Sequence, residues 1–322
     1  MRDAQVSKAL PRMHQRGRAD RMSGDALHGT VARRALILLA ILTLVWGTNW
    51  PLFAFAVREV SVWTFRAVSV AIAGTVLLAV ARVRGQSLVI PRRHLPRICT
   101  ATFFYLVLWN IASTYSAILI PSGQSAVLGF TMPLWSALIS WAVLGERLSP
   151  RLVLAIALGA AAVTLLMVPS LATYARAPLG LALGLLAGVG WAVGTLILKR
   201  GGDLGVSATV LTGWQLLITA VPTTLGALVL ADGGWFMPSW QSILVIAYIA
   251  LVPMSIGNVC WFAIVGLLPA SVAGLSAVLV PVVAMISGAL VHGEPLGAVQ
   301  WIAMACSASA LWLALARPAS VR

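Results

Sequence analysis

Long apolar stretches separated by short polar turns run through this chain from residue 36 to residue 316. Each stretch is close to the roughly 20 apolar residues that an α-helix needs to cross the hydrocarbon core of a bilayer. The turns carry helix-ending residues such as Pro150, Pro178 and the run Gly201-Gly202-Asp203. We therefore predict an all-α membrane protein with ten transmembrane helices: Leu36–Val57, Trp63–Ala81, Leu95–Ile118, Gly123–Leu144, Leu152–Val168, Leu179–Leu198, Ser207–Leu230, Trp240–Val265, Ala270–Val291 and Leu296–Ala316.

The composition supports the membrane assignment. Of the 322 residues, 60% are hydrophobic and 9% are charged, and the mean hydropathy is +0.97, whereas soluble domains carry about 25% charged residues. A net charge of +14 could indicate a nucleic-acid partner. The basic residues, however, lie at helix ends and in the N-terminal segment rather than in a soluble domain. We therefore expect membrane lipid as a partner and no nucleic acid.

Residues 1–34 form a polar segment with eight Lys or Arg residues and three Asp residues. A secretory signal has a shorter charged region, and a small-residue cleavage site follows its apolar run, which is not the case here. We predict a disordered basic tail on the cytoplasmic side, with Met22 as an alternative start of the native chain.

Polar and turn residues between positions 110 and 146 recur 148 positions later without a gap. The pairs are Asn110 and Asn258, Pro121 and Pro269, Pro133 and Pro281, Gly145 and Gly293, and Glu146 and Glu294. Trp46 and Trp191 match at a shift of 145, which fits a loop of different length. We predict two five-helix units, residues 35–170 and 177–317. Because five is odd, the second unit crosses the membrane in the opposite sense, as in the inverted repeats of many secondary transporters.

The Lys and Arg residues predict the orientation. Cytoplasmic loops carry an excess of these residues. With the N-terminal tail inside, the basic clusters at 82–97, 147–151 and 199–200 all fall on the cytoplasmic side. The outer side then holds only Arg58, Arg66 and Arg176. Both termini are therefore predicted to be cytoplasmic.

Residues suited to catalysis are missing from the predicted membrane core. It contains no Asp or Glu away from helix ends, and its histidines are His94, in a loop, and His292, beside a turn. No paired carboxylates, Ser-His arrangement or metal-ligand cluster occurs, so we predict neither an enzyme nor a cofactor or metal site. Proton-coupled carriers usually hold an ionisable relay in the bundle. Its absence favours gradient-driven movement of a solute.

Tryptophan, tyrosine and asparagine side chains recur on single faces of predicted helices. Trp46, Asn49 and Trp50 follow i, i+3, i+4 spacing on the first helix. Aromatic rings beside amides can stack on a planar ring or hold an ammonium group by cation–π contact. We predict a substrate cavity lined by Trp46, Asn49, Trp50, Tyr105, Trp109, Asn110, Trp191 and Asn258. Any single Trp could instead be a packing residue, and Asn110 and Asn258 could instead join helices by interhelical hydrogen bonds.

Two repeated features have alternative explanations. Pro133 and Pro281 fall in the middle of predicted helices, where proline removes a backbone donor and kinks the helix. Each kink is either a hinge for gating or purely structural. Gly145-Glu146 and Gly293-Glu294 are predicted as structural turns, in which the carboxylate accepts N–H groups at the start of the next helix. Contact with substrate is the less favoured alternative.

Arg66 is the one charge that plausibly lies within a predicted helix, near its outer end. A long basic side chain can extend to the membrane interface so that its charge stays hydrated. The alternative is a fixed cation facing a substrate path.

These features together resemble a known family. Ten helices in two units, the motif Trp46-Gly47-Thr48-Asn49-Trp50 and the doubled Gly-Glu are similar to the EamA family of the drug/metabolite transporter superfamily. The resemblance covers Leu36 to Ala316. The Trp-rich interior resembles the YddG-like aromatic amino acid exporters.

The resemblance implies a multi-pass exporter of the bacterial inner membrane, with a central cavity between the two repeats. We expect a small-molecule substrate, an amino acid or related metabolite, carried by alternating access. Export of a drug or another metabolite is the alternative within the superfamily, and a non-transporting membrane scaffold is the alternative outside it. No motif specifies the oligomeric state, and a monomer is expected.

Overall fold

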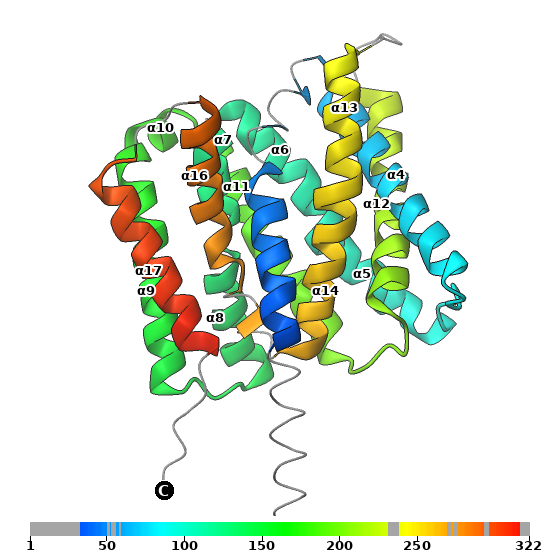
Figure 1. Ribbon diagram of the computed structural model, residues 1–322, viewed down its shortest axis with the longest axis horizontal. Coiled ribbons are helices and arrows are strands. Elements are labelled where there is room, and N and C mark those ends of the chain that lie inside the picture. Colours follow the sequence, from blue (N-terminus) through cyan, green and yellow to red (C-terminus); the bar gives the residue numbers. More distant parts are fainter. Residues whose placement is uncertain are drawn as a thin grey trace, which may run out of the picture.

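The computed structural model describes residues 33–49, 52, 56–57, 59–120, 122–230, 238–268, 272–273, 276–292 and 296–315. Regular structure within these ranges is entirely helical, without a strand (Figure 1). The predicted all-α class is confirmed for this part of the chain. Some predicted features lie outside the described residues: the tail up to residue 32, Trp50, Arg58, Gly293 and Glu294.

The first half of the chain begins with a helix over residues 33–47. It continues with α4 (Val62–Val83), η1 (Arg92–His94), α5 (Leu95–Thr102), η2 (Phe103–Leu108), α6 (Trp109–Leu119), α7 (Ser122–Gly129), α8 (Met132–Leu144), α9 (Pro150–Met167), η3 (Val168–Ser170) and α10 (Leu171–Arg176). The elements α5, η2 and α6 follow one another without a break and form one long helix.

The second half has a similar order of elements. It contains α11 (Pro178–Arg200), α12 (Ala208–Leu230), α13 (Trp240–Ile249), η4 (Ala250–Gly257), α14 (Asn258–Leu267), η5 (Ser276–Leu279), α16 (Val280–His292) and α17 (Ala298–Leu315). Here α13, η4 and α14 form the long continuous helix.

Seven helices of the described chain are long and apolar enough to cross a membrane. They are Val62–Val83, Arg92–Leu119, Gln124–Leu144, Pro150–Arg176, Pro178–Arg200, Ala208–Leu230 and Trp240–Leu267. These correspond to the second through eighth predicted segments. The first, ninth and tenth segments border residues outside the described ranges, so the total of ten stays a prediction.

Helices from the two halves lie side by side on the two opposite sides of the helix bundle. α4 packs against α12, and α9 packs against α17 (Figure 1). Between these pairs, α11 packs against α6 and α8, and Trp46 at the end of the first helix contacts Trp261 on α14. The large, fully buried side chains of Trp261 and Tyr105 lie in this central region. The core is therefore built jointly by both halves.

The two long helices share an irregularity. Both η2 and η4 are π-helical, and each lies just before one of the paired asparagines, Asn110 and Asn258. π-helical segments are rare, appear mostly as short bulges within α-helices, and are frequent at functional sites. Both segments lie beside the cavity described below.

The paired prolines mark interruptions rather than kinks within continuous helices. The predicted fourth helix is divided into α7 and α8, and Pro133 lies in the first turn of α8. Pro281 occupies the same place in α16, directly after the 3₁₀ turn η5. Proline is tolerated in a first helical turn because its missing N–H would have no partner there. The prediction of a mid-helix proline was therefore wrong in this respect.

The turn after α8 has the predicted position but not the predicted cap. Gly145 ends α8 with a φ of 66°, a left-handed conformation that glycine adopts without a steric penalty. The next helix, α9, is capped by Ser149, whose Oγ accepts a hydrogen bond from the Leu152 N–H at 3.2 Å. The predicted capping role of Glu146 was therefore wrong, because a serine closer to the helix start performs it.

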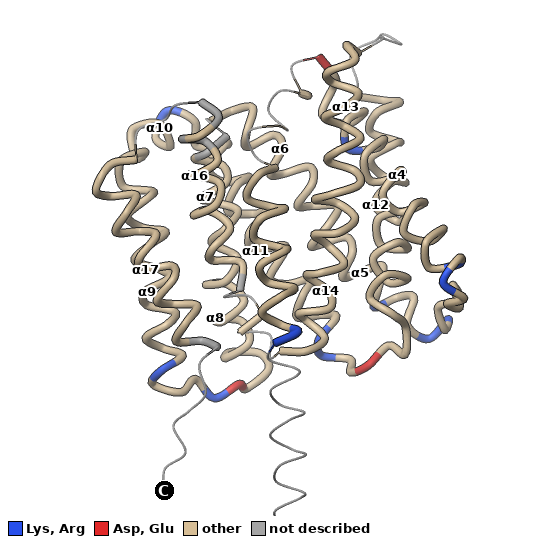
Figure 2. The backbone as a smooth tube through the Cα atoms, in the orientation of Figure 1, with Lys and Arg blue, Asp and Glu red and all other residues tan. Residues whose placement is uncertain are grey.

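Lys and Arg residues of the described chain gather at one end of the molecule, where α8 and α17 finish (Figure 2). The opposite end, where α13 begins and α10 lies, carries few of them (Figure 2). Two surfaces of different charge are therefore separated by the length of the helices.

Candidate substrate cavity

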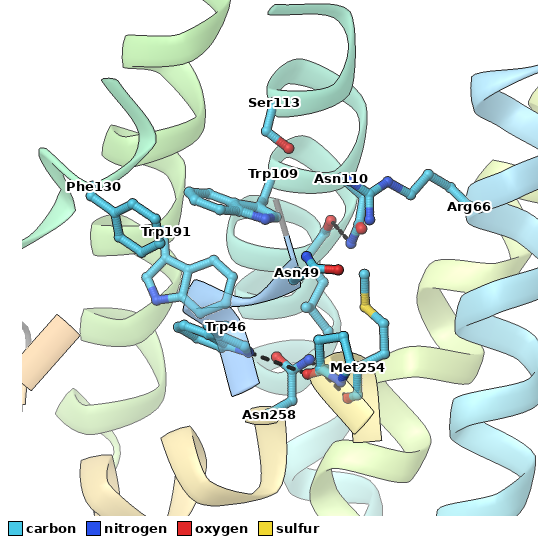
Figure 3. A pocket seen from close by; sticks show the side chains of 12 residues that line it. Trp46, Asn49, Arg66, Trp109, Asn110, Ser113, Phe130, Trp191, Met254 and Asn258 are labelled. Atoms are coloured by element: carbon cyan, nitrogen blue, oxygen red, sulfur yellow. Dashed lines mark hydrogen bonds between the residues drawn. The ribbon is translucent and has the colours of Figure 1, made fainter. Parts of the chain in front are cut away.

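A cavity lies between helices that come from both halves of the chain (Figure 3). The empty space amounts to about 550 Å³ when the part that opens outward is included, and about 50 Å³ of it can hold the centre of a water-sized molecule. The lining residues are Trp46, Asn49, Arg66, Leu106, Trp109, Asn110, Ser113, Phe130, Trp191, Pro253, Met254 and Asn258.

Aromatic rings form one wall of this cavity, with Trp191 of α11 at its centre. The ring of Trp191 lies edge-on to those of Trp46 and Trp109, at centroid distances of 5.2 and 4.8 Å. Phe130 extends the wall beyond Trp109 at 6.5 Å, and Trp261 supports it from behind, 5.5 Å from Trp191. Edge-to-face pairs of this kind are stabilising beyond the area that they bury. The wall is therefore largely apolar and stabilised by ring-to-ring packing.

Trp46 is held against the backbone of the π-helical segment. Its Nε1 donates a hydrogen bond to the carbonyl oxygen of Pro253 at 3.2 Å. This approach requires glycine at position 257, because a Cβ atom there would lie only 2.3 Å from Nε1 of Trp46. The indole consequently reaches a backbone carbonyl that most side chains at position 257 would block.

Asn110 and Asn258 both line the cavity and each carries a buried acceptor oxygen. Their Nδ2 atoms donate to the carbonyl oxygens of Leu106 and Met254, at 2.7 and 2.8 Å. A carbonyl oxygen accepts hydrogen bonds but cannot donate them, so these bonds identify which side-chain amide atom is the nitrogen. Oδ1 of each asparagine therefore points away from that carbonyl. Both Oδ1 atoms are buried and have no hydrogen-bond partner within the described protein. Neither Nδ2 bond joins two helices, so the geometry favours the cavity-lining hypothesis over an interhelical bond.

Asn49 adds a third acceptor of the same kind. It lies at the end of the first helix, and its Oδ1 is likewise buried without a hydrogen-bond partner in the described chain. Three amide oxygens from three different helices therefore line one cavity. Such oxygens accept hydrogen bonds from N–H or O–H groups and do not bind anions.

Arg66 reaches the cavity from α4 (Figure 3). Only 5% of its surface is exposed, and its Nε donates to Oγ1 of Thr114 at 2.9 Å. The guanidinium is thus directed into the protein rather than outward to a membrane interface. This placement agrees with the hypothesis of a fixed cation and not with an extended interfacial side chain.

The structure brings together six of the eight predicted lining residues: Trp46, Asn49, Trp109, Asn110, Trp191 and Asn258. Trp50 lies outside the described residues. Tyr105 is fully buried and contacts Trp191 and Phe262 instead of lining the cavity. Tyr105 was predicted from the helix face that it shares with Trp109, and both residues do contact Trp191, but Tyr105 is fully covered and Leu106 lines the cavity instead.

Six further lining residues did not appear in the predicted set: Arg66, Leu106, Ser113, Phe130, Pro253 and Met254. Leu106 and Met254 could have been found, because each lies four residues before a paired asparagine and so shares its face. Ser113 lies three residues after Asn110 and follows the same rule. Phe130, at the break between α7 and α8, has no comparable signal.

Among the described residues, neither metal-binding clusters nor acidic groups contribute to this site. In the part of the chain that the structure describes, no group of three or more His, Cys, Asp and Glu residues could hold a metal ion. The described lining also contains no carboxylate. The cavity offers aromatic surface, amide oxygens and one cation, a set suited to binding a small organic solute.

Comparison with known families decides what kind of protein contains this cavity. The model of the EamA-like transporter family matches the chain twice, over residues 33–168 and 178–316. The chain belongs to the EamA-like transporter family. It is a multi-pass membrane transporter, and the chain's resemblance to that family is confirmed.

Curated relatives that match this EamA-like transporter include two uncharacterized transporters. The uncharacterized transporter YvbV of Bacillus subtilis is 27% identical over 277 residues, covering 82% of this chain and 85% of the relative. The uncharacterized inner membrane transporter YedA of Escherichia coli K12 is 25% identical over 268 residues, covering 83% and 85%. A solved crystal structure with 20% identity matches with a TM-score of 0.70 over 87% of this chain and 96% of the other. That likeness concerns the fold alone.

Proposed function

We propose that this protein exports amino acids, aromatic or of broader selectivity, across a bacterial inner membrane. The observation that carries the proposal is the shared cavity of aromatic rings and amide oxygens without hydrogen-bond partners. An ammonium group can donate hydrogen bonds to the oxygens of Asn49, Asn110 and Asn258. The rings of Trp46, Trp109 and Trp191 can hold an apolar or aromatic side chain and attract the ammonium group.

Alternating access between two inverted five-helix units is the proposed mechanism. The double match to the family model, at 33–168 and 178–316, supports two units. The equivalent helices α8 and α16 end at opposite sides of the molecule (Figure 1), which supports the inversion. The open space in the cavity is small for an amino acid, so binding requires the walls to move apart. The interruptions at Pro133 and Pro281 are the proposed hinges.

Charge placement supports the proposed orientation. The end of the molecule that is rich in Lys and Arg (Figure 2) would face the cytoplasm under the positive-inside rule. α17 finishes at that end, which supports a cytoplasmic C-terminus. The described lining carries no carboxylate that could relay protons, and this supports gradient-driven movement.

Export of a drug or another small metabolite is the second candidate function. The aromatic wall around Trp191 favours it, because organic cations also bind to such rings. The non-transporting scaffold is disfavoured, since that hypothesis predicts a solid core and a cavity is present.

A flux assay tests the proposal. Purified protein is reconstituted into sealed liposomes, and the liposomes are loaded with labelled amino acids, nucleosides or organic cations. Efflux of the label is then followed with and without an imposed pH difference. We expect efflux of amino acids that follows their own gradient. Efflux of organic cations alone would favour the second candidate. Accumulation against a gradient that follows the pH difference would contradict gradient-driven movement.

A further inference from the structure

Two polar contacts, one at each end of the molecule, join the proposed five-helix units to each other. In both, the loop after the first helix of one unit meets the start of the third helix of the other unit. Glu59 contacts Ser239, which precedes α13, and Gly202 contacts Arg97, in the first turn of α5. α13 and α5 begin at opposite ends of the molecule (Figure 1). The two contacts therefore have the placement that an inverted repeat predicts.

Glu59 holds the start of α13 with both carboxylate oxygens. Its Oε2 accepts a hydrogen bond from the Ser239 N–H at 3.0 Å, and the Ser239 hydroxyl lies 3.0 and 2.8 Å from Oε1 and Oε2. That hydroxyl also caps α13, because it accepts from the Ser242 N–H at 3.3 Å. Hydrogen bonds to a carboxylate are stronger than those between neutral groups, and a negative charge is favourable at a helix N-terminus.

Arg97 holds the turn that follows α11 at the other end. Its Nη2 donates to the carbonyl oxygen of Gly202 at 2.9 Å. The guanidinium packs so closely on this turn that a Cβ atom at Gly201 would overlap Nη1. Gly202 itself has a φ of 70°, a conformation suited to glycine. A positive charge is favourable at the C-terminus of a helix, so each contact uses the charge that its helix end prefers.

Alternating access gives these contacts opposite consequences. When two units rock against each other, they separate at one end and close at the other. A hydrogen bond that joins the units at one end can form only while that end is closed. Both contacts are present in this structure, together with a cavity whose open space is small. Each contact therefore stabilises closure of its own end.

We propose that these two contacts are opposed conformational latches that set the balance between the outward-open and inward-open states. The Glu59 contact holds the outer end closed, and the Arg97 contact holds the cytoplasmic end closed. The inference rests on the alternating access of the proposed function and names the groups that bias it. Loss of either contact shifts the population toward the state that is open at that end.

Labelling of a single cysteine reports which end of the cavity is open. Ser113 lines the cavity, so Ser113→Cys is introduced into a chain whose three native cysteines are replaced by alanine. A membrane-impermeant maleimide is applied from outside to intact cells and from inside to inverted vesicles. We expect Glu59→Gln to raise the outside rate about fivefold and lower the inside rate, and Arg97→Met to do the reverse, because each removes a bond to a charged group.

Three further variants separate latching from a general loss of stability. Arg92→Met removes an exposed cation close to Arg97 and should leave both labelling rates unchanged. Arg97→Lys keeps a donor for the carbonyl and should retain most of the closure. The double variant Glu59→Gln, Arg97→Met should return the ratio of outside to inside rates toward wild type. Thermal unfolding of each purified variant checks that it folds.

The labelling requires no transported substrate, so the result is independent of amino acid export. Unchanged rates in both single variants would overturn the latches. Rates that rise on both sides in each variant would also overturn them, because they report loosening rather than a shift between two states. The expected shifts without flux of any amino acid would refute the export but support the latches. Flux of phenylalanine with unchanged labelling would support the export and refute the latches.

Discussion

Asn110 and Asn258 make the same hydrogen bond in two different helices: each amide nitrogen donates to the carbonyl four residues before it, at 2.7 and 2.8 Å. The two residues lie 148 positions apart and each follows a π-helical segment. The common bond leaves both Oδ1 atoms buried without a hydrogen-bond partner in the described protein, in residues that line the cavity. A repeated sequence element has thus produced two matching acceptors in one site.

Replacing either asparagine by leucine should separate function from stability. Leucine has a similar size but cannot accept a hydrogen bond, and it removes a buried oxygen that has no partner in the described protein. We expect Asn110→Leu and Asn258→Leu each to lower amino acid flux by about tenfold while the melting temperature stays equal or rises. Flux assays and thermal unfolding of the same preparations measure both. Unchanged flux in both variants would remove these residues from the site.

Trp191→Ala should affect stability as well as flux. Trp191 is only 2% exposed and packs within an aromatic cluster. Its removal leaves a void, at a typical cost of about 3–5 kcal/mol. Trp191→Phe should cost less and keep the wall. The control is Trp301→Ala, because Trp301 is 59% exposed and its loss should change the melting temperature little.

Gly257 and Gly266 form a matched pair on one long helix. A Cβ at Gly257 would lie 2.3 Å from Nε1 of Trp46, whereas nothing lies within 4 Å of a Cβ at Gly266. We expect Gly257→Ala to displace Trp46, shift its fluorescence and lower flux. Gly266→Ala should be neutral or stabilising by about 0.5–1 kcal/mol, because alanine is the better helix former. Equal behaviour of the two variants would contradict the observed packing of Trp46.

Lys199 joins α11 to the end of α14. Its Nζ donates to the carbonyl oxygens of Val265 and Leu268, at 2.5 and 2.6 Å, which are among the groups that a helix end leaves unpaired. Lys199→Met keeps the apolar stem but loses both bonds, and should destabilise the fold by about 1–3 kcal/mol. Thermal unfolding measures this. Arg200→Met, at an exposed position, should have little effect, and a similar loss in both variants would argue for a general charge effect.

Glu59 should make stability depend on pH in the acidic range. Hydrogen bonds from Ser242 and Ser239 lower the pKa of Glu59 below its ordinary value of 4.5. Since the folded state favours the deprotonated carboxylate, its contribution is present above that value and is lost as the pH falls through the lowered pKa. The melting temperature of Glu59→Gln should therefore lie below wild type near pH 7 and approach it near pH 3. A difference that grows on acidification would contradict this assignment.

The sequence predicted the helices well where the chain contains clear boundary residues. Gly145 ends α8 and Pro178 begins α11, as expected from glycine and proline chemistry. Ser149 was not recognised as the cap of α9 because the nearby Glu146 is also suited to a helix N-terminus. Choosing between them requires backbone geometry, which a pattern of residue types does not contain.

Only part of the cavity was predicted, again because a pattern of residue types does not contain the three-dimensional packing. Trp46, Asn49 and Trp109 were found by α-helical spacing, whereas Asn110 and Asn258 were found by the repeat at 148 positions. Tyr105 was included wrongly because spacing gives a helix face but not the side chains that cover it, and Tyr105 is buried under Trp191 and Phe262. Arg66 could not be placed, because its flexible side chain can reach either the interface or the interior, and only tertiary contact with Thr114 decides between them.

Counterflow in sealed proteoliposomes tests the central claim most directly. Vesicles loaded with unlabelled phenylalanine are diluted into a trace of labelled phenylalanine, and transient uptake of label reports exchange through the protein. We predict clear uptake by wild-type protein, and uptake reduced by about tenfold or more in the double variant Asn110→Leu, Asn258→Leu. Absence of uptake by folded wild-type protein, or full uptake by the folded double variant, would contradict amino acid transport through this cavity.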